Sequence, residues 1–269
     1  MPELPEMENY KLLLSEKVVG KSVSEVIVTR EKTINVPVTQ FTTEVQGRTI
    51  MAIERRAKHL LFKLDSGKSL LLHLMLGGLM YVADEEGEID RTKQVTLSLG
   101  AMKLFFIGLR LGYLHLVTEE QVQEAFSDLG PEPLEPTFKE NLFQELIAKR
   151  RGMLKTTLVN QKFLAGIGNL YSDEICFEAQ VLQIRKANEL TDEEIKQLFK
   201  AIHTILQRGI RLGGYMDVPV HKKDQLTGNY SNHCYVYERE GLPCPRCGGV
   251  IIKDVISSRK SFYCKQCQK

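Results

Sequence analysis

The sequence lacks several features that would place a protein in a class at once. Its 269 residues contain no apolar stretch long enough to span a bilayer. The first residues are acidic and include no apolar segment of the kind that directs export, so we expect a cytoplasmic protein. No internal repeat or low-complexity tract occurs, and the net charge of +2 is too small to indicate a partner. The length allows one large domain or two smaller ones, and 43% apolar residues permit a sizeable core.

The excess of basic residues is small, but it is unevenly placed. Between Pro243 and Lys269, six Lys or Arg residues are accompanied by one acidic residue, Asp254. A second basic run contains Lys149, Arg150, Arg151, Lys155 and Lys162. Clustered basic charge is typical of proteins that bind nucleic acids. For the second run taken by itself, a solvated helix face explains the pattern better than a nucleic-acid contact.

Cysteine is also sparse, and its placement is informative. Four of the six cysteines form the pairs Cys244-x-x-Cys247 and Cys264-x-x-Cys267, with sixteen residues between the pairs. In an intracellular chain this spacing favours a four-cysteine zinc ribbon over disulfides. Four thiolates leave no open position on the metal, so we expect one structural Zn²⁺. Such a ribbon can bind DNA, with Arg259 near its hairpin tip, or it can bind another protein.

The first half of the chain predicts one helix followed by many short strands. Apolar residues recur at helical spacing from Leu4 to about Val19, and Gly20 ends the pattern. Strands are then predicted over residues 23–28, 49–55, 59–64, 70–74, 95–99, 102–106 and 113–117. Strands of this number and length indicate a β-sandwich or barrel packed with the N-terminal helix.

The composition changes after residue 128. Residues 129–137 are rich in proline and cannot continue a helix, so they predict an interdomain linker. Helical patterns follow near residues 138–149, 152–160, 169–179 and 192–212, the last with Thr191 and Glu194 as a capping box. We therefore expect an α+β protein with a β-sandwich domain (1–128), the linker, a helical domain (138–233) and a zinc module (234–269).

The first residues, Met1-Pro2-Glu3, offer a candidate nucleophile. If Met1 is removed, Pro2 carries a secondary amine that can condense with a sugar aldehyde carbon to give a Schiff base. An α-amino group titrates near pH ~8, so part of it is neutral at cell pH. Glu3 follows directly and can supply or remove a proton. Proline-rich termini are common, however, and this start by itself is more typical of an inert terminus.

A turn with two glycines separates two of the predicted helices. The segment reads Gln161-x-x-x-Ala165-Gly166-Ile167-Gly168-Asn169. Glycines before a helix N-terminus expose backbone N–H groups that can bind a phosphate, and Asn169 can add an amide donor. A packing turn without a ligand would have the same spacing.

Four features in this order resemble the formamidopyrimidine-DNA glycosylase and endonuclease VIII family, and its formamidopyrimidine branch in particular. They are the Pro2–Glu6 start, the Arg56–Leu61 segment, the Ala165–Tyr171 turn, and the four-cysteine ending with its lead-in at 235–241. The resemblance covers essentially the whole chain. It implies a β-sandwich with an N-terminal helix, a helix–two-turns–helix domain and a zinc finger.

The resemblance also implies roles for single residues. Pro2 matches the nucleophile that attacks C1′ of the damaged nucleotide, Glu3 matches the carboxylate that protonates the opening sugar, and Glu6 matches a supporting carboxylate. The residues that match phosphate contacts around the extruded nucleotide are Lys58, Lys155, Asn169 and Arg259, to which Arg110 adds a neighbouring contact. For Lys58, an ordinary exposed lysine at a strand start is the alternative.

Three departures from the family pattern concern recognition of the lesion. Leu76 stands where the family has a methionine that fills the gap left by the flipped base. In the segment 107–112, Leu109 replaces the arginine that reads the orphaned base and Leu111 replaces the aromatic wedge. The residues 215–220 differ from the usual lesion-covering loop. An alternative places Leu109 inward and brings another residue, such as Met75, into the stack.

The sequence therefore predicts a monomeric, bacterial, nucleoid-associated DNA glycosylase with AP-lyase activity on damaged or abasic double-stranded DNA. Its expected chemistry is a Schiff base at Pro2 followed by β- and δ-elimination. Two other classes remain open: a non-catalytic relative that binds damaged DNA, and a zinc-ribbon interaction protein.

Overall fold

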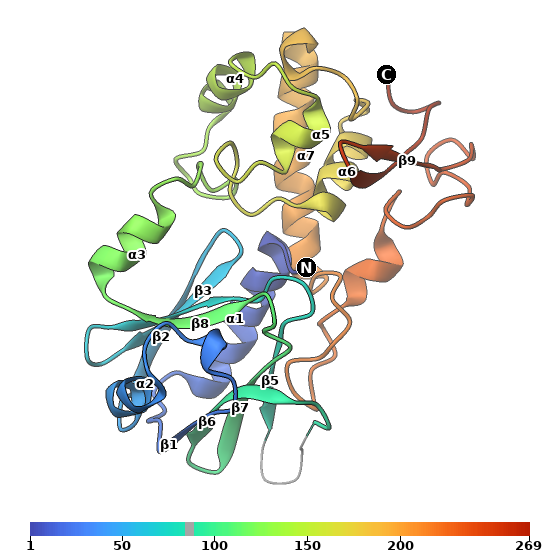
Figure 1. Cartoon of the computed structure of the whole chain (residues 1–269). Coiled ribbons are helices and arrows are strands. Elements are labelled where there is room, and N and C mark those ends of the chain that lie inside the picture. Colours follow the sequence, from blue (N-terminus) through green and yellow to red (C-terminus); the bar gives the residue numbers. More distant parts are fainter. Residues whose placement is uncertain (84–88) are drawn as a thin grey trace. The chain divides into compact units, whose positions relative to one another are not determined.

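The chain folds into two compact units in the computed structural model, which describes residues 1–83 and 89–269 (Figure 1). Unit 1 comprises Met1–Ser127 together with Leu212–Asn229, and unit 2 comprises Asp128–Arg211 together with Tyr230–Lys269. From the sequence, residues 212–229 were expected in the second domain. The structure differs here, because this loop returns to unit 1 and buries Val220 in its core.

Unit 1 contains two four-stranded antiparallel sheets. One has the order β1 (Glu25–Val28), β6 (Lys93–Leu99), β7 (Met102–Ile107) and β5 (Leu79–Ala83). The other has the order β2 (Ile50–Arg56), β3 (His59–Leu64), β4 (Ser69–His73) and β8 (Tyr113–Val117). Helix α1 (Leu4–Val18) packs on β2 and β3.

The two sheets share one core, which makes them a sandwich. On β3, Leu60 and Phe62 face this core, where the Phe62 ring meets Phe106 of the other sheet edge-on at 5.8 Å between ring centroids. The alternate residue Leu61 faces outward into a second apolar cluster that includes Val122 of α3 (Glu119–Phe126). This alternation follows from the two-residue period of a strand. It confirms the sandwich with an N-terminal helix.

The sequence analysis did not predict β5, α3, the short helix α2 (Val38–Val45) or the 3₁₀ turn at Glu31–Thr33 in unit 1. Strand β5 has no clear alternation, since all but one of its five residues are buried. Helix α3 begins at a capping box formed by Thr118 and Gln121, which the sequence analysis did not consider.

Unit 2 consists of four α-helices and a β-hairpin. The helices are α4 (Glu140–Ala148), α5 (Leu154–Leu158), α6 (Asn169–Glu178) and α7 (Asp192–Arg211), and the hairpin joins β9 (Ile252–Ile256) to β10 (Arg259–Tyr263). Helix α7 begins at the predicted capping box, because Thr191 N–H donates to Glu194 at 2.8 Å and Glu194 N–H donates to the Thr191 hydroxyl at 3.3 Å. Short 3₁₀ turns lie at Glu31–Thr33, Ala187–Glu189 and Asn229–His233.

Two buried carboxylates on α6 connect the helices with the cysteine module. Glu174 accepts hydrogen bonds from the backbone N–H groups of residues 235–237 and from the hydroxyl of Tyr230. Asp173 accepts from Phe262 N–H and from the hydroxyl of Ser261 on β10. Burial raises the pKa of the Glu174 carboxyl, and its four donors oppose that rise. The cysteine module therefore packs against α6 and is not an independent domain.

Among the described residues, no helix is both long and apolar enough to cross a bilayer.

Candidate functional site

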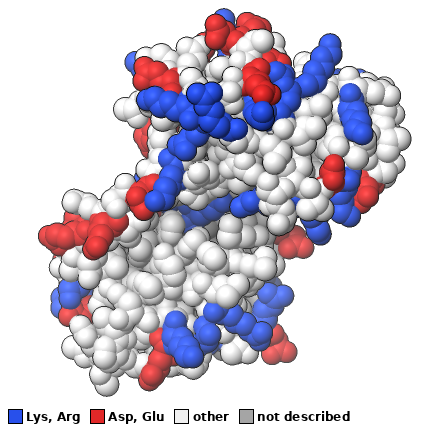
Figure 2. All heavy atoms as spheres, turned by 45° about the horizontal axis from the view of Figure 1, so that its top comes forward, with Lys and Arg blue, Asp and Glu red and all other residues white. Residues whose placement is uncertain are grey.

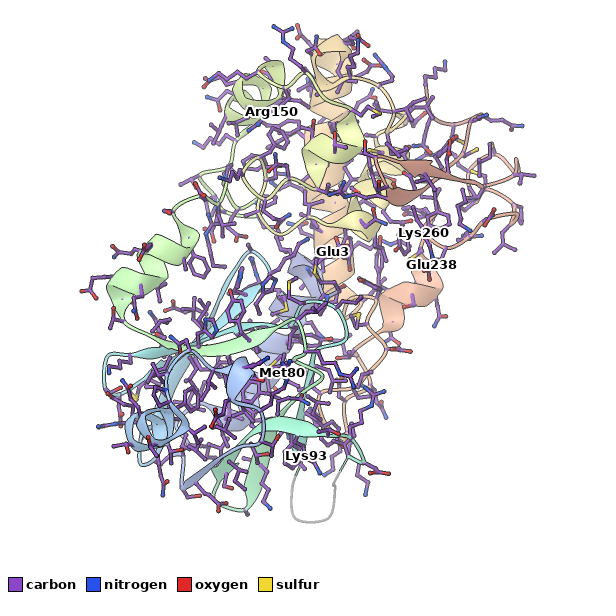
Figure 3. The ribbon with its side chains drawn as sticks, in the orientation of Figure 1. Glu3, Met80, Lys93, Arg150, Glu238 and Lys260 are labelled. Carbon is purple, nitrogen blue, oxygen red and sulfur yellow. The ribbon has the colours of Figure 1, made fainter. Side chains whose placement is uncertain are left out.

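The amino end of α1 is buried and tightly ordered. Glu3 is the N-cap residue, and its side chain is only 2% exposed (Figure 3). Its backbone N–H donates to Glu6 Oε2 at 2.8 Å, while the Glu3 side chain accepts from the Glu6 backbone N–H. Pro2 is buried, and Pro5 occupies the first turn, where a missing N–H costs no hydrogen bond. This reciprocal capping box holds both carboxylates beside the chain terminus.

The charge of the terminal amine is tuned by this environment. Burial lowers the pKa of the amino terminus below its usual value of 8.0, and the nearby Lys58 ammonium lowers it further. The carboxylates of Glu3 and Glu6 act in the opposite direction. This amino group is that of Met1, which must be removed before the Pro2 nitrogen becomes a free amine. The structure thus brings together four of the residues singled out from the sequence.

Lys58 is placed by a tight hairpin. Arg56 pairs with His59 across β2 and β3, so Ala57 and Lys58 form a two-residue turn. Ala57 takes a left-handed conformation with φ of 53°. Lys58 is 6% exposed, which excludes the reading as an ordinary exposed lysine.

The loop after α7 packs against the same helix end, and sequence reasoning missed this. Tyr215 N–H donates to Glu6 Oε1 at 3.0 Å, and Asn9 donates to the Thr227 hydroxyl at 2.9 Å. Gly214 has φ of +73°, and a Cβ there would lie 2.4 Å from Glu6 Oε1. Glycine is therefore required for both its conformation and the close approach. The Gly213-Gly214 pair was the available signal, although it was interpreted only as a helix stop.

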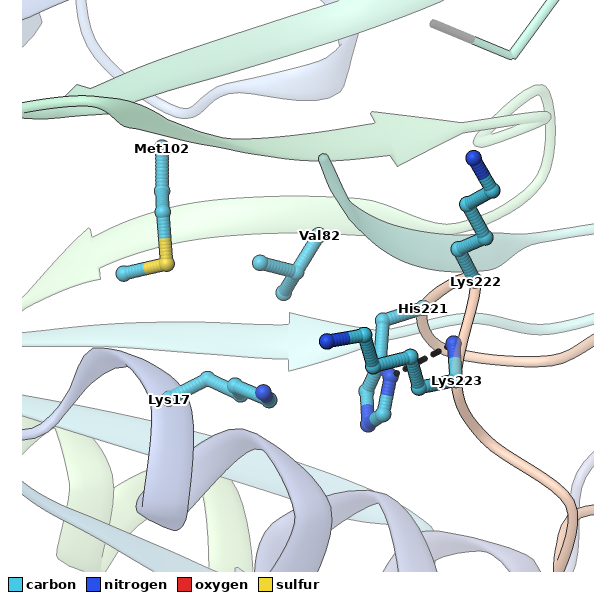
Figure 4. A pocket seen from close by; sticks show the side chains of 6 residues that line it. All are labelled: Lys17, Val82, Met102, His221, Lys222 and Lys223. Atoms are coloured by element: carbon cyan, nitrogen blue, oxygen red, sulfur yellow. Dashed lines mark hydrogen bonds between the residues drawn. The ribbon is translucent and has the colours of Figure 1, made fainter. Parts of the chain in front are cut away.

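The rest of this loop is anchored to the sandwich. Val82 N–H on β5 donates to Val220 O at 2.7 Å, and Asp224 accepts backbone N–H bonds from Val220, Leu226 and Thr227. The loop, β5, β7 and α1 line a small surface pocket whose residues include three lysines and no acid (Figure 4). The loop that replaces the family's lesion-covering segment is thus fixed at Val220.

The three substituted leucines have different environments. Leu76 and Leu111 are 67% and 65% exposed, and both line one open hollow together with Arg110. Leu109 is fully buried in the sandwich core, where its N–H donates to Gln94. The expectation that Leu109 contacts the orphaned base is therefore wrong for this conformation, because an inward side chain cannot reach a base. The alternative with Leu109 inward is the one observed, and Met75 is half-buried.

In unit 2, the predicted phosphate turn is built around Gln161. Its amide donates to the carbonyls of Val159 and Ile167, and its oxygen accepts from Gly166 N–H at 2.9 Å. Gly168 is the N-cap of α6, which places Asn169 at the first helical position. The turn is therefore pre-formed.

Asn169 links this turn to the zinc hairpin. Its Nδ2 donates to Lys260 O at 3.0 Å, and Lys260 lies on β10 (Figure 3). Its Oδ1 is buried and has no hydrogen-bond partner among the described residues. Arg259 is exposed beside a tight turn in which Ser257 and Ser258 both have positive φ. The N-terminus of α6, a favourable place for an anion, thus meets β10 beside Arg259, whose guanidinium donates to Ser257 O at 3.3 Å.

Lys155 does not belong to this group. Its side chain is 0% exposed, and Nζ donates to Asp173 at 2.7 Å, to Asn169 O at 2.7 Å and to Ser172 at 2.9 Å. The predicted phosphate contact is wrong for this residue, because all three ammonium donors are already used inside the protein. In the basic run around it, Arg150 lies over the Phe163 ring and Lys162 forms an exposed ion pair with Asp128, while Lys149 and Arg151 are exposed.

Substitutions separate these roles. We expect Lys155→Met to lower the free energy of unfolding by about 3–5 kcal/mol, because it leaves the buried Asp173 without its cation. We expect Lys155→Met to leave the salt dependence of DNA binding unchanged. Arg259→Ala, by contrast, should reduce the slope of the logarithm of the DNA-binding constant against the logarithm of the salt concentration by about 1. Denaturant unfolding and DNA titrations at several salt concentrations measure both. Lys162→Met, at an exposed ion pair, is the matched control. A reduced slope in the Lys155 variant would show that Lys155 does contact a DNA phosphate.

Basic side chains lie on the surfaces of both units in the view of Figure 2, and acidic side chains lie beside many of them. In the cysteine module, two of them are structural: Arg246 stacks on Phe177 at 4.3 Å, and Lys253 pairs with Glu240. Arg259 and Lys260 are exposed. The exposed basic residues of the module thus include two at the hairpin, Arg259 and Lys260, and two beyond it, Lys265 and Lys269.

The four cysteines fit a single zinc ion. Their sulfur atoms lie within 4.8 Å of one another, with 3.7 Å between Cys244 and Cys267 and 3.6 Å between Cys247 and Cys264. A tetrahedral site with Zn–S bonds of about 2.3 Å requires sulfur atoms about 3.8 Å apart. Cys244 and Cys264 also belong to an apolar cluster with Phe177 of α6. Zinc at this site holds the hairpin and thereby positions Arg259.

Comparison with known proteins matches this arrangement along the chain. Residues 1–113 match the formamidopyrimidine-DNA glycosylase N-terminal domain, residues 129–217 match the H2TH domain of the same glycosylases, and residues 241–269 match the zinc finger found in FPG and IleRS.

Relatives and solved structures agree over the full length. The chain is 35% identical to a formamidopyrimidine-DNA glycosylase of Pelotomaculum thermopropionicum, with 100% of this chain and 99% of the relative covered. It is 36% identical to the corresponding protein of Listeria innocua, with both fully covered. The structure of a Lactococcus lactis FPG variant with Fapy-dG-containing DNA has a TM-score of 0.92, 31% identity and full coverage of both chains. The L. lactis Fpg complex with DNA containing an abasic site has a TM-score of 0.92, 30% identity and 99% coverage of each. This chain therefore belongs to the formamidopyrimidine-DNA glycosylase family.

Proposed function

We propose that this protein is a base-excision-repair DNA glycosylase with AP-lyase activity. The observation that carries the proposal is the buried amino end of unit 1. Pro2, Glu3, Glu6 and Lys58 are all buried there, and Glu3, Glu6 and Lys58 act electrostatically on the amino terminus. A neutral amine beside a carboxylate is what Schiff-base chemistry at a sugar carbon needs.

Each of these residues has a part in the reaction. Once Met1 is removed, the Pro2 nitrogen attacks C1′ of the damaged nucleotide, and the base leaves. Glu3 moves protons between the amine and the opening sugar. Lys58 supplies a positive charge for a phosphate next to the flipped nucleotide. The Glu6 carboxylate accepts hydrogen bonds from the backbone N–H groups of Glu3 and Tyr215, and so fixes the positions of these two residues.

The second unit supplies the grip on the DNA backbone. Asn169 and Arg259 bind phosphate at the N-terminus of α6, and zinc holds the hairpin that carries Arg259. Arg110, Leu76 and Leu111 are the exposed candidates for filling and flanking the gap in the duplex. We further propose that the protein acts as a monomer in the bacterial cytoplasm, on the nucleoid.

Cleavage of a duplex with one abasic site tests this function. We expect strand scission that leaves phosphates at both new ends, which is the product pattern of β- followed by δ-elimination. A panel of duplexes with different base lesions then identifies the substrate. Binding without scission would instead support a non-catalytic relative, and absence of salt-sensitive DNA binding would leave a zinc-ribbon interaction protein.

Selectivity for the base opposite the lesion is expected to be weak. The exposed Leu76 and Leu111 have no donor for a base edge, and Leu109 is buried. A bidentate arginine contact would contribute about 1–3 kcal/mol of discrimination, which is roughly tenfold to a hundredfold. We therefore expect less than about tenfold preference among opposite C, T, G and A, measured as cleavage rates on four matched duplexes. A strong preference for cytosine would mean that another donor, such as Arg110, reads the base.

A further inference from the structure

The turn between β7 and β8 carries Leu111, and it packs against the turn between β4 and β5 that carries Leu76. Gly108 has φ of +71°, and a Cβ there would lie 2.1 Å from the backbone oxygen of Gly77. The two turns therefore touch backbone to backbone. Their exposed leucines line the same open hollow, so the position of one turn depends on the other.

Leu111 follows a segment that is firmly held. Leu109 is fully buried in the sandwich core, and its N–H donates to Gln94 Oε1 at 3.2 Å. Arg30 Nη1 donates to Leu109 O at 2.9 Å and to Arg110 O at 3.4 Å. Arg110 O belongs to the peptide group that joins Arg110 to Leu111. Among the described residues, the Leu111 backbone has no hydrogen-bond partner of its own, so the bond from Arg30 to Arg110 O directly precedes it.

The chemistry of Arg30 suits it to hold this turn. Its Nη1 carries two N–H donors, one for each of the two successive carbonyl groups. Hydrogen bonds from a charged donor are stronger than neutral ones, and the planar guanidinium is more rigid than a lysine ammonium. Arg30 follows β1, so it ties the turn after β7 to a strand at the edge of the same sheet.

We propose that Arg30 is a positioning residue that holds the Arg110–Leu111 peptide so that the Leu111 side chain is ready to enter the gap in the duplex. The inference rests on the proposed glycosylase function, in which Leu111 fills that gap. A stacked duplex resists the insertion of a side chain, because unstacking a base step costs free energy. A loose turn would also lose its backbone freedom on insertion, whereas a turn fixed by Arg30 has already lost it on folding. Arg30 therefore acts on insertion and takes no part in the chemistry at the sugar.

Insertion can be measured without catalysis. The probe is a duplex with a tetrahydrofuran abasic analogue, in which 2-aminopurine stands beside the orphaned base and fluoresces when it is unstacked. We expect Arg30→Gln to lower the equilibrium constant for unstacking about tenfold, which corresponds to the backbone freedom of one residue. Arg48→Gln, at an exposed arginine of the same unit, is the matched control and should stay within about twofold of the unmodified protein.

A second substitution separates positioning from a direct contact with DNA. In a Leu111→Ala background there is no wedge to position, so adding Arg30→Gln should change the unstacking constant by less than about twofold. A tenfold loss in that background as well would overturn the proposal. A fall of about 0.9 in the slope of the logarithm of the binding constant against the logarithm of the salt concentration would also overturn it, because a lost phosphate contact has that effect.

Borohydride trapping connects the result with the proposed function. We expect Arg30→Gln to slow trapping of an abasic site in a duplex about tenfold and to leave trapping of the same site in single-stranded DNA within about twofold, because a single strand has no opposite stack to enter. Equal slowing on both DNAs, or none on the duplex, would contradict the proposal. If the unmodified protein traps neither DNA, the proposed function fails, and the fluorescence measurement still decides whether Arg30 positions Leu111.

Discussion

A form of the protein that keeps Met1 is expected to show no covalent trapping on abasic DNA. In that form the Pro2 nitrogen is part of a peptide bond, and its lone pair is delocalised into the carbonyl group. The mature form, with Pro2 first, should be trapped by borohydride as a protein–DNA adduct. The expected difference is therefore complete and not graded, since an amide nitrogen cannot form a Schiff base.

Both forms can be made from one sequence. Inhibiting methionine removal during expression gives the form that keeps Met1. Treating that form with a methionine aminopeptidase gives the mature form, so the same sample before and after treatment provides the comparison. In the mature background, Pro2→Gly keeps a free amine but loses the ring that orients it. We expect it to trap roughly 10²-fold more slowly, the typical consequence of an attacking atom misplaced by about 1 Å. Efficient trapping by the form that retains Met1 would show that Pro2 is not the nucleophile.

Loss of zinc is expected to abolish specific DNA binding while the β-sandwich stays folded. Zinc contributes about 10–16 kcal/mol to the folding of small zinc modules. Without it, the hairpin that carries Arg259 and meets Asn169 loses its support. The core of unit 1 is a separate cluster that contains no cysteine, so its unfolding transition should persist.

Cys264→Ser and chelation should give the same result. Cys234→Ser is the matched control, because Cys234 lies outside the metal set and its sulfur donates to Tyr230 O, a bond that a serine hydroxyl can keep. DNA titration and two-probe thermal unfolding measure the two effects. Because Cys264 shares a cluster with Phe177 of α6, we also expect part of unit 2 to loosen. Unchanged affinity after verified zinc loss would contradict the prediction.

Much of the fold could be predicted because its signals are local. Strands His59–Leu64 and Tyr113–Val117 were predicted to the residue, since alternation and turn residues mark both ends. The missed elements lack such signals: β5 is buried almost throughout, so no alternation appears. The loop at 212–229 was assigned to the wrong unit because a single buried side chain, Val220, decides its position.

The candidate site divides in the same way. The sequence by itself determined which groups are available for chemistry: a proline and a glutamate at the amino end, and four cysteines at zinc spacing. Only the tertiary structure decided which basic and apolar residues face outward. Lys155 and Leu109 match the family positions but are buried, and Tyr215 meets the amino end across more than two hundred residues of chain. The physical reason is that burial and long-range contact depend on what packs opposite a side chain, and a residue's own sequence neighbourhood does not contain that information.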